Sequence, residues 1–261
     1  MDAVANHCRV GVDDRLRIRW PAPLPDGRRI VLRHRASGGT LEEPVGGDRT
    51  SVALAVGELD PGKWQVRLMA GGTDVPLLTD DPCFSFEEMR AYAGAPRDRA
   101  VRVVRSPEGH VSLRVRQVSP HAEVEAVHPG DGEIRVEGRL AYAGPRPGVP
   151  ARLTAVARET RHTLTRDARL DGTEFHVCLP VDAFAAEEPA LWDLFLDAGD
   201  VHARLATRLD DAPGKRGKVS FPRQLAPVGD AGDERRMSVR PYYTGRDELS
   251  IASHLVTEET Q

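Results

Sequence analysis

The chain of 261 residues is long enough for one large domain or for two domains of about 100–150 residues each. It carries 36 basic and 40 acidic residues, a formal net charge of −4, which excludes a generally basic nucleic-acid binder. Hydrophobic residues make up 40% of the chain, enough for a folded core, whereas aromatic residues make up only 5%, which is few for an aromatic sugar cleft.

The N-terminal sequence has neither the basic region nor the apolar region of a signal peptide. No apolar run reaches the roughly 18–20 residues that cross a bilayer, so we expect a soluble, cytoplasmic protein without a membrane span. The three cysteines, Cys8, Cys83 and Cys178, are odd in number and form no CxxC pair. This predicts free thiols, mostly buried, rather than a disulfide framework or a zinc site.

Alternation of apolar and polar residues predicts β-strands along most of the chain, with glycine and proline turns between them. The clearest runs cover residues 16–20, 30–34, 52–56 and 64–68 in the first half and 134–136, 153–156, 175–179 and 194–196 in the second. Helix is predicted only over Phe86–Tyr92 and Asp182–Glu188. The fold class is therefore all-β, built from β-sandwiches.

The two halves of the chain align with each other. Trp64–Gly71 matches Trp192–Gly199 without a gap, the strand at 52–56 lies over 177–181, and 111–113 lies over 249–251. A period near 125–130 residues indicates duplicated domains. We therefore predict two tandem immunoglobulin-like sandwiches, each with a C-terminal hairpin-like tail, over residues 1–118 and 130–261, with a linker at 119–129.

The two matched tryptophans each follow a predicted crossing between sheets. Leu59–Trp64 contains a Pro-Gly turn of the kind found at a sandwich corner, and Pro189–Trp192 occupies the same place in the second half. We predict that Trp64 and Trp192 are buried, one in each core, at equivalent strand positions.

The sequence contains no nucleotide-binding, hydrolase or metalloprotease motif, and we predict no catalytic residue, no cofactor and no metal. His121, Glu123, Glu125 and His128 crowd together, which a charged linker explains without a metal. Asp80-Asp81 and Asp210-Asp211 are interpreted as turn devices whose carboxylates bind backbone N–H groups, rather than as calcium or acid–base pairs.

Basic segments leave an alternative open. Pro213–Lys218 is interpreted as a strand-connecting loop, with a phosphate or polyanion contact as the alternative. The alternating arginines of Arg15–Arg19 and Arg99–Arg105 are interpreted as solvated sheet faces or blunted edges, with a weak anionic-polymer site as the alternative.

Three stretches in the second half carry a family resemblance: Leu191–Gly199, Arg204–Asp211, and Val239–Thr244 with Leu249–Ile251. They resemble β-sandwich domains appended to actinobacterial cell-wall, teichoic-acid-type glycosyltransferases and CDP-glycerol glycerophosphotransferases. The tandem pair is also similar to the C-terminal pair of a wall-teichoic-acid glycosyltransferase, where such a pair supports trimerisation. The resemblance covers residues 130–255 well and 10–118 more loosely, lacks the catalytic domain, and implies no catalytic residue here.

We therefore predict a non-catalytic accessory, oligomerisation or binding module associated with a cell-wall polymer or natural-product glycosyltransferase system. Its expected partners are a second copy, a glycosyltransferase, or a polysaccharide or anionic polymer, and not a nucleic acid. The predicted binding residues are Tyr242, Tyr243 and Arg240, and the hairpin at 239–251 is the expected anchor for self-association. The alternatives are a stand-alone carbohydrate- or polymer-binding protein and an enzyme with its site between the sandwiches, using His121, His128 and Arg240.

Overall fold

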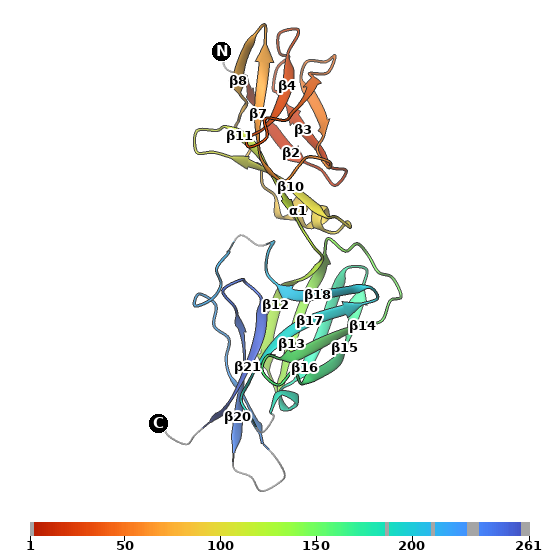
Figure 1. The fold of residues 1–261 in the computed structure, drawn as a ribbon, viewed down its shortest axis with the longest axis vertical. Coiled ribbons are helices and arrows are strands. Elements are labelled where there is room, and N and C mark those ends of the chain that lie inside the picture. The colour runs from red at the N-terminus through yellow and green to blue at the C-terminus, as the bar shows by residue number, and fades with distance from the viewer. Residues whose placement is uncertain (1–2, 186–187, 210–211, 229–234, 257–261) are drawn as a thin grey trace. The chain divides into compact units, whose positions relative to one another are not determined.

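A computed structural model describes residues 3–185, 188–209, 212–228 and 235–256. The chain divides into two compact units, the first comprising Met1–Ala93 and Arg97–Ser119, the second Gly94–Pro96 and Pro120–Gln261 (Figure 1). Within the described residues, helix is confined to α1 (Phe86–Ala93) and the 3-10 turn η1 (Val181–Phe184). The prediction of an all-β chain of immunoglobulin-like sandwiches is confirmed.

The first unit is a sandwich of two antiparallel sheets. The smaller sheet has the order β2 (His7–Val10), β3 (Arg15–Arg19), β6 (Ser51–Ala55). The larger has the order β10 (Arg99–Arg105), β11 (Val111–Gln117), β7 (Gly62–Ala70), β4 (Arg29–His34), β5 (Thr40–Pro44), and β8 (Thr73–Pro76) also pairs with β7. Two short parallel strands, β1 (Val4–Ala5) and β9 (Leu78–Thr79), complete the unit. Alternate residues of both sheets, among them Leu16, Ile18, Ile30 and Leu113, form its core.

In the second unit, antiparallel and parallel pairing of the strands forms a closed ring. Its members in ring order are β14 (Ala151–Ala157), β15 (Thr163–Asp171), β16 (Glu174–Pro180), β13 (Glu133–Ala141), β12 (His121–Gly130), β18 (Val201–Ala206) and β17 (Ala190–Ala198). Pairing of β17 with β14 closes the ring. Outside it, β21 (Leu249–Val256) pairs with β17, followed by β20 (Arg236–Tyr243) and β19 (Gln224–Pro227).

The strand registers show that the two units are repeats of one design. Trp64 of β7 lies opposite Leu113 of β11, and Trp192 of β17 lies opposite Ile251 of β21. These are the pairs that the sequence alignment of the two halves places together. The tails are the expected hairpins, β10–β11 and β20–β21.

Both matched tryptophans are buried, as predicted. Trp64 is 5% exposed in the first core and Trp192 is 1% exposed in the second. The Trp64 indole N–H donates to the carbonyl of Asp60, and the Trp192 N–H donates to Ser253 Oγ. Gly62, with φ of 143°, begins β7, and a Cβ there would meet the His34 ring at 2.2 Å. The Pro-Gly corner thus requires glycine both for its backbone angle and for the packing of His34.

The predicted linker at 119–129 is wrong for most of its length, because residues 121–130 form β12, the first strand of the second unit. A β-bulge between Val124 and Ala126 interrupts the alternation of side chains, which removes the period that marks a strand. The helix predicted at Phe86–Tyr92 is confirmed as α1. The one predicted at Asp182–Glu188 is only the turn η1, and residues 186–187 lie outside the described part.

The three cysteines are free, as expected, but the expectation that they are mostly buried is wrong: only Cys8 is buried, Cys83 is partly exposed and Cys178 is exposed. Among the described residues, no helix has the length and apolar character needed to cross a membrane.

Removing either core tryptophan should destabilise the fold. We expect Trp64→Ala and Trp192→Ala each to lower the free energy of unfolding by about 3–5 kcal/mol, the usual cost of a large-to-small change in a packed core. Urea unfolding followed by circular dichroism measures the loss, with the exposed neighbour Gln65→Ala as the control. A loss below about 1 kcal/mol would place the indole at the surface.

Candidate functional site

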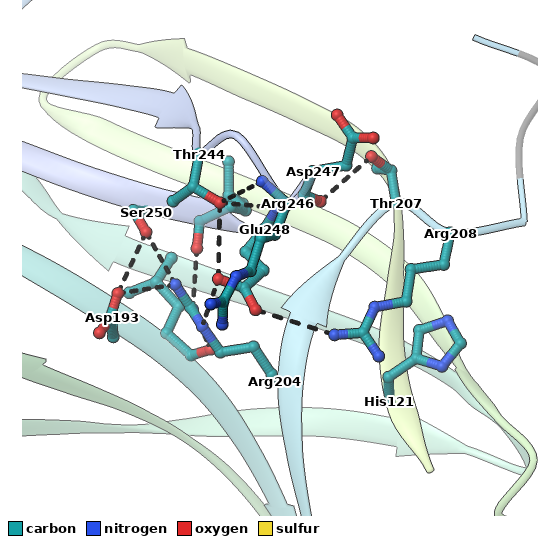
Figure 2. Close-up of polar contacts among 12 residues, drawn as sticks. His121, Asp193, Arg204, Thr207, Arg208, Thr244, Arg246, Asp247, Glu248 and Ser250 are labelled. Carbon is teal, nitrogen blue, oxygen red and sulfur yellow. Dashed lines mark hydrogen bonds and ion pairs between the residues drawn. The ribbon is translucent and has the colours of Figure 1, made fainter. Parts of the chain in front are cut away.

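A cluster of charged side chains lies on the second unit where β17, β18 and β21 meet (Figure 2). At its centre is Arg204 of β18, whose side chain is only 13% exposed. Its guanidinium donates to the carbonyls of Leu194 and Leu249 at 2.6 and 2.9 Å, and to Asp193 Oδ1 and Ser250 Oγ, both at 2.8 Å.

The position of Arg204 follows from the way in which β17 is shared. One half of β17 pairs with β21, up to Asp193, and the other half pairs with β18, from Phe195 onward. Leu194 lies at the fork between the two partners, where its carbonyl has no strand opposite. Because an unpaired carbonyl is costly, the guanidinium of Arg204 acts there as a substitute for a strand.

The first unit resolves the same fork with backbone alone. Val66 of β7 occupies the position of Leu194, and its carbonyl accepts the N–H of Leu77 at 2.9 Å. The carbonyl of Leu77 in turn accepts the N–H of Val111, which occupies the position of Leu249. Arg204 is therefore a structural clamp particular to the second unit.

Asp193 is the carboxylate partner of this clamp. It accepts hydrogen bonds from Arg204 and from Arg158, whose Nη2 lies 2.8 Å from Asp193 Oδ1. Partial burial works against ionisation of Asp193, but the hydrogen bond from Arg158 and the charge of Arg204 outweigh it and hold its pKa below the ordinary value. Burial of Arg204 disfavours its charged form and therefore lowers its pKa.

The turn between β20 and β21 supplies the outer part of the cluster. Glu248 lies 3.8 Å from Arg208 Nη2 and accepts from Thr244 Oγ1 at 3.4 Å. Asp247 accepts the backbone N–H groups of Gly214 and Lys215 at 2.9 and 2.7 Å. These amides belong to the basic loop 213–218, so an acidic side chain of the protein itself holds the donors that a phosphate would require.

A further carboxylate, that of Asp81, was expected at a turn and is buried with both oxygens hydrogen-bonded. Asp81 accepts the N–H groups of Cys8 and Cys83, each at 2.8 Å, and both its oxygens bind Arg9, which confirms its structural interpretation. Burial alone disfavours its ionised form, but these donors outweigh burial and lower its pKa. Asp210 and Asp211 lie outside the described residues.

The charged group noted in the sequence lies on β12, and its members have different partners. It comprises His121, Glu123, Glu125 and His128. Glu123 is buried, lies 2.8 Å from His121 Nε2, and accepts the backbone N–H groups of Arg208 and Leu209. Glu125 instead pairs with Arg139. Among the described residues, no three His, Cys, Asp or Glu side chains gather in a way that could hold a metal.

The three predicted binding residues do not form one surface. Tyr243 is 7% exposed and packs in the second core against the Phe221 ring, with centroids 5.8 Å apart. Tyr242 and Arg240 lie on the other face of β20; Arg240 is exposed, and the Tyr242 hydroxyl is buried with no hydrogen-bond partner in the described part. Tyr243 is thus a core residue and is not available for stacking or self-association.

The enzyme alternative is not supported by the positions of its residues. His121 and His128 are on β12, and Arg240 is on β20; the strands β18, β17 and β21 lie between them. His121 is buried and hydrogen-bonded to Glu123.

Two open hollows of about 480 and 320 Å³ lie on the first unit, the larger between the loops 25–28 and 45–49. Asp26, in the larger hollow, pairs with Arg49, which leaves no free acid–base pair there.

No protein-family model and no curated protein sequence matches the chain. Its structural neighbours include Staphylococcus aureus TarS, at 12% identity and a TM-score of 0.42, covering 66% of this chain and 33% of that one. They also include the chicken interferon gamma receptor alpha chain (12% identity, TM-score 0.25, 76% and 92% covered) and a two-domain fibronectin type-III segment of chicken tenascin (10%, 0.24, 77% and 93%). The chain thus spans about a third of the TarS chain. At these identities and TM-scores, the likenesses carry no inference about function.

The clamp interpretation predicts a large difference between two arginines that share one carboxylate. Arg204→Met should lower the free energy of unfolding by about 2–3 kcal/mol, because it leaves the Leu194 carbonyl and Asp193 without their buried partner. The matched change Arg158→Met, on the exposed side of the same carboxylate, should cost less than about 1 kcal/mol. Equal losses in urea unfolding would show that the fork does not need the guanidinium.

Asp81 should stabilise the first unit in a pH-dependent way. Because its pKa is lower in the folded protein than its ordinary value of 3.8, its contribution is present above about pH 4 and is lost as pH falls through the folded value. Asp81→Asn should therefore cost about 2 kcal/mol at pH 7, with a penalty that shrinks below pH 4. A penalty that stays constant from pH 7 to pH 3 would contradict the ionised role.

Proposed function

We propose that this chain is a non-catalytic accessory or binding module that serves enzymes building a cell-surface polymer. One observation carries the proposal. The partly or fully buried carboxylates that resemble catalytic groups all accept hydrogen bonds that hold the fold together. Asp81, Glu123 and Asp247 each hold backbone N–H groups, and Asp193 holds two guanidinium groups. A general acid or base must instead be free to exchange a proton with a substrate.

The link with wall-polymer enzymes rests on the sequence resemblance of residues 191–199 and 204–211. The first stretch and the start of the second lie on β17 and β18 around the clamp: Trp192 fills the core, Asp193 binds Arg204, and Arg204 closes the fork. The resemblance therefore concerns the residues that hold the second sandwich together, as expected for a domain that is kept for its shape. A glycosyltransferase and a surface polymer are the partners proposed for it.

Two assays on the purified chain test this function. The first measures turnover of UDP-N-acetylglucosamine and of CDP-glycerol, and we expect none above buffer. The second measures retardation of the chain in native gels cast with a polymer, either dextran or long-chain polyphosphate, and we expect retardation in at least one of them.

Either of two results would overturn the proposal. Turnover that a single substitution of a surface carboxylate abolishes would make the chain an enzyme. Unchanged mobility in both gels would remove its role as a polymer-binding module.

A further inference from the structure

The outward face of the larger sheet of the first unit carries cations that lie directly opposite one another on adjacent strands. Arg102 of β10 is in register with Arg114 of β11, and Arg114 is in register with Lys63 of β7. Arg35, one residue beyond β4, continues the row, because its N–H donates to the carbonyl of Lys63 at 2.9 Å. All four residues are exposed, and we call them the cation row.

The orientation of the row is fixed by the core residues beside it. Leu113, Trp64 and His34 each precede or follow a member of the row in sequence, are buried, and lie opposite one another in the same register. Because successive side chains of a strand point to opposite faces, the burial of this inner row directs the cation row outward.

No carboxylate compensates the row. In the described part of the chain, none of its four members forms an ion pair, and Arg102 donates instead to the sulfur of Met89 at 3.2 Å. The positions on the same face two residues away along the strands add no acid; they are Ala100, Val104, Ser112, Arg116, Gln65 and Arg33.

The acidic groups of this face lie at its other end and are already used. Asp74 pairs with Arg33 and Arg67, and Glu42 pairs with Arg29. The same sheet thus neutralises its cations at one end, and in the described part of the chain it leaves the members of the cation row without a carboxylate partner at the other.

Like charges placed directly opposite one another destabilise a sheet, so the row costs stability in the free protein. We propose that the cation row binds a linear polyanion carrying phosphate-type groups. This inference gives the proposed binding module its surface and its ligand class, and it rests on that function.

The geometry of the row favours an extended polymer. Adjacent strands are about 4.8 Å apart, so the three cations on strands and Arg35, directly after β4, span about 14 Å across an open sheet face. Arginine binds two phosphate oxygens at once, and lysine provides a compact point charge, so the row can hold successive anionic groups. The outward neighbours Val104, Ser112 and Gln65 offer no aromatic ring for a base to stack on, which disfavours a nucleic acid.

Lys63→Glu is the decisive variant, because Lys63 lies between Arg114 and Arg35. The new carboxylate would turn two repulsive neighbours into attractive ones, so the melting temperature should stay the same or rise. Binding of long-chain polyphosphate, measured by calorimetry at low salt, should weaken about 30-fold, because one positive charge of the row is replaced by a negative charge. The affinity of the wild-type chain should also fall steeply as salt rises.

The matched control is Arg169→Glu on β15, an exposed arginine of the second unit that lies outside both arginine runs of the first unit. It makes the same change in net charge, and we expect it to weaken polyphosphate binding less than about threefold. Lys63→Arg keeps the charge and should keep the affinity.

Several outcomes would overturn the inference. An equal loss in Lys63→Glu and Arg169→Glu would reduce binding to net charge, and tighter binding of single-stranded DNA than of polyphosphate would overturn the ligand class. Binding of dextran but not polyphosphate would remove the inference and leave the proposed function standing. Binding of neither polymer would remove both.

Discussion

The antiparallel register of the two tryptophan strands is the constraint on which the rest of each unit depends. It places Trp64 opposite Leu113 and Trp192 opposite Ile251, so that alternate side chains of each strand fill a core. A slip of one residue would turn every side chain of the strand to the other face. It would bury Lys63 and expose Trp64, and so would lose the core and the cation row together.

One design meets the same local problem in two ways. The strand that carries the tryptophan divides one edge between two partners, and the fork leaves a carbonyl to satisfy in each unit. The first unit uses the backbone of Leu77, which bridges Val66 and Val111. The second uses the Arg204 guanidinium, which binds Leu194 and Leu249. A charged clamp then needs a carboxylate, and Asp193 supplies it, so the cluster that most resembles an active site follows from the topology.

The sequence predicts the features that depend on the alternation of apolar and polar residues and on matched positions in the two halves. The matched tryptophans, the two sandwiches, helix α1 and the tail hairpins follow from alternation and from the repeat. Strand β12 was missed because its bulge breaks the alternation and because the burial of His121 and Glu123 is a tertiary effect. Tyr243 was misplaced because alternation along β20 does not say which of two adjacent tyrosines faces the core. The arginines of 99–105 were visible, but their alignment with Arg114 and Lys63 depends on pairing between strands that are far apart in sequence.

Nuclear magnetic resonance on a uniformly isotope-labelled sample tests the central constraint directly. Cross-strand nuclear Overhauser effects should join the backbone of Trp64 to that of Leu113, and Trp192 to Ile251, because opposite residues in antiparallel strands lie about 4.5–5.5 Å apart between Cα atoms. In the same spectra Lys63 should contact Arg114. Contacts of Trp192 with Ser250 or Ala252 in place of Ile251, or of Trp64 with Ser112 or Arg114 in place of Leu113, would show a different register and contradict both the shared design and the cation row.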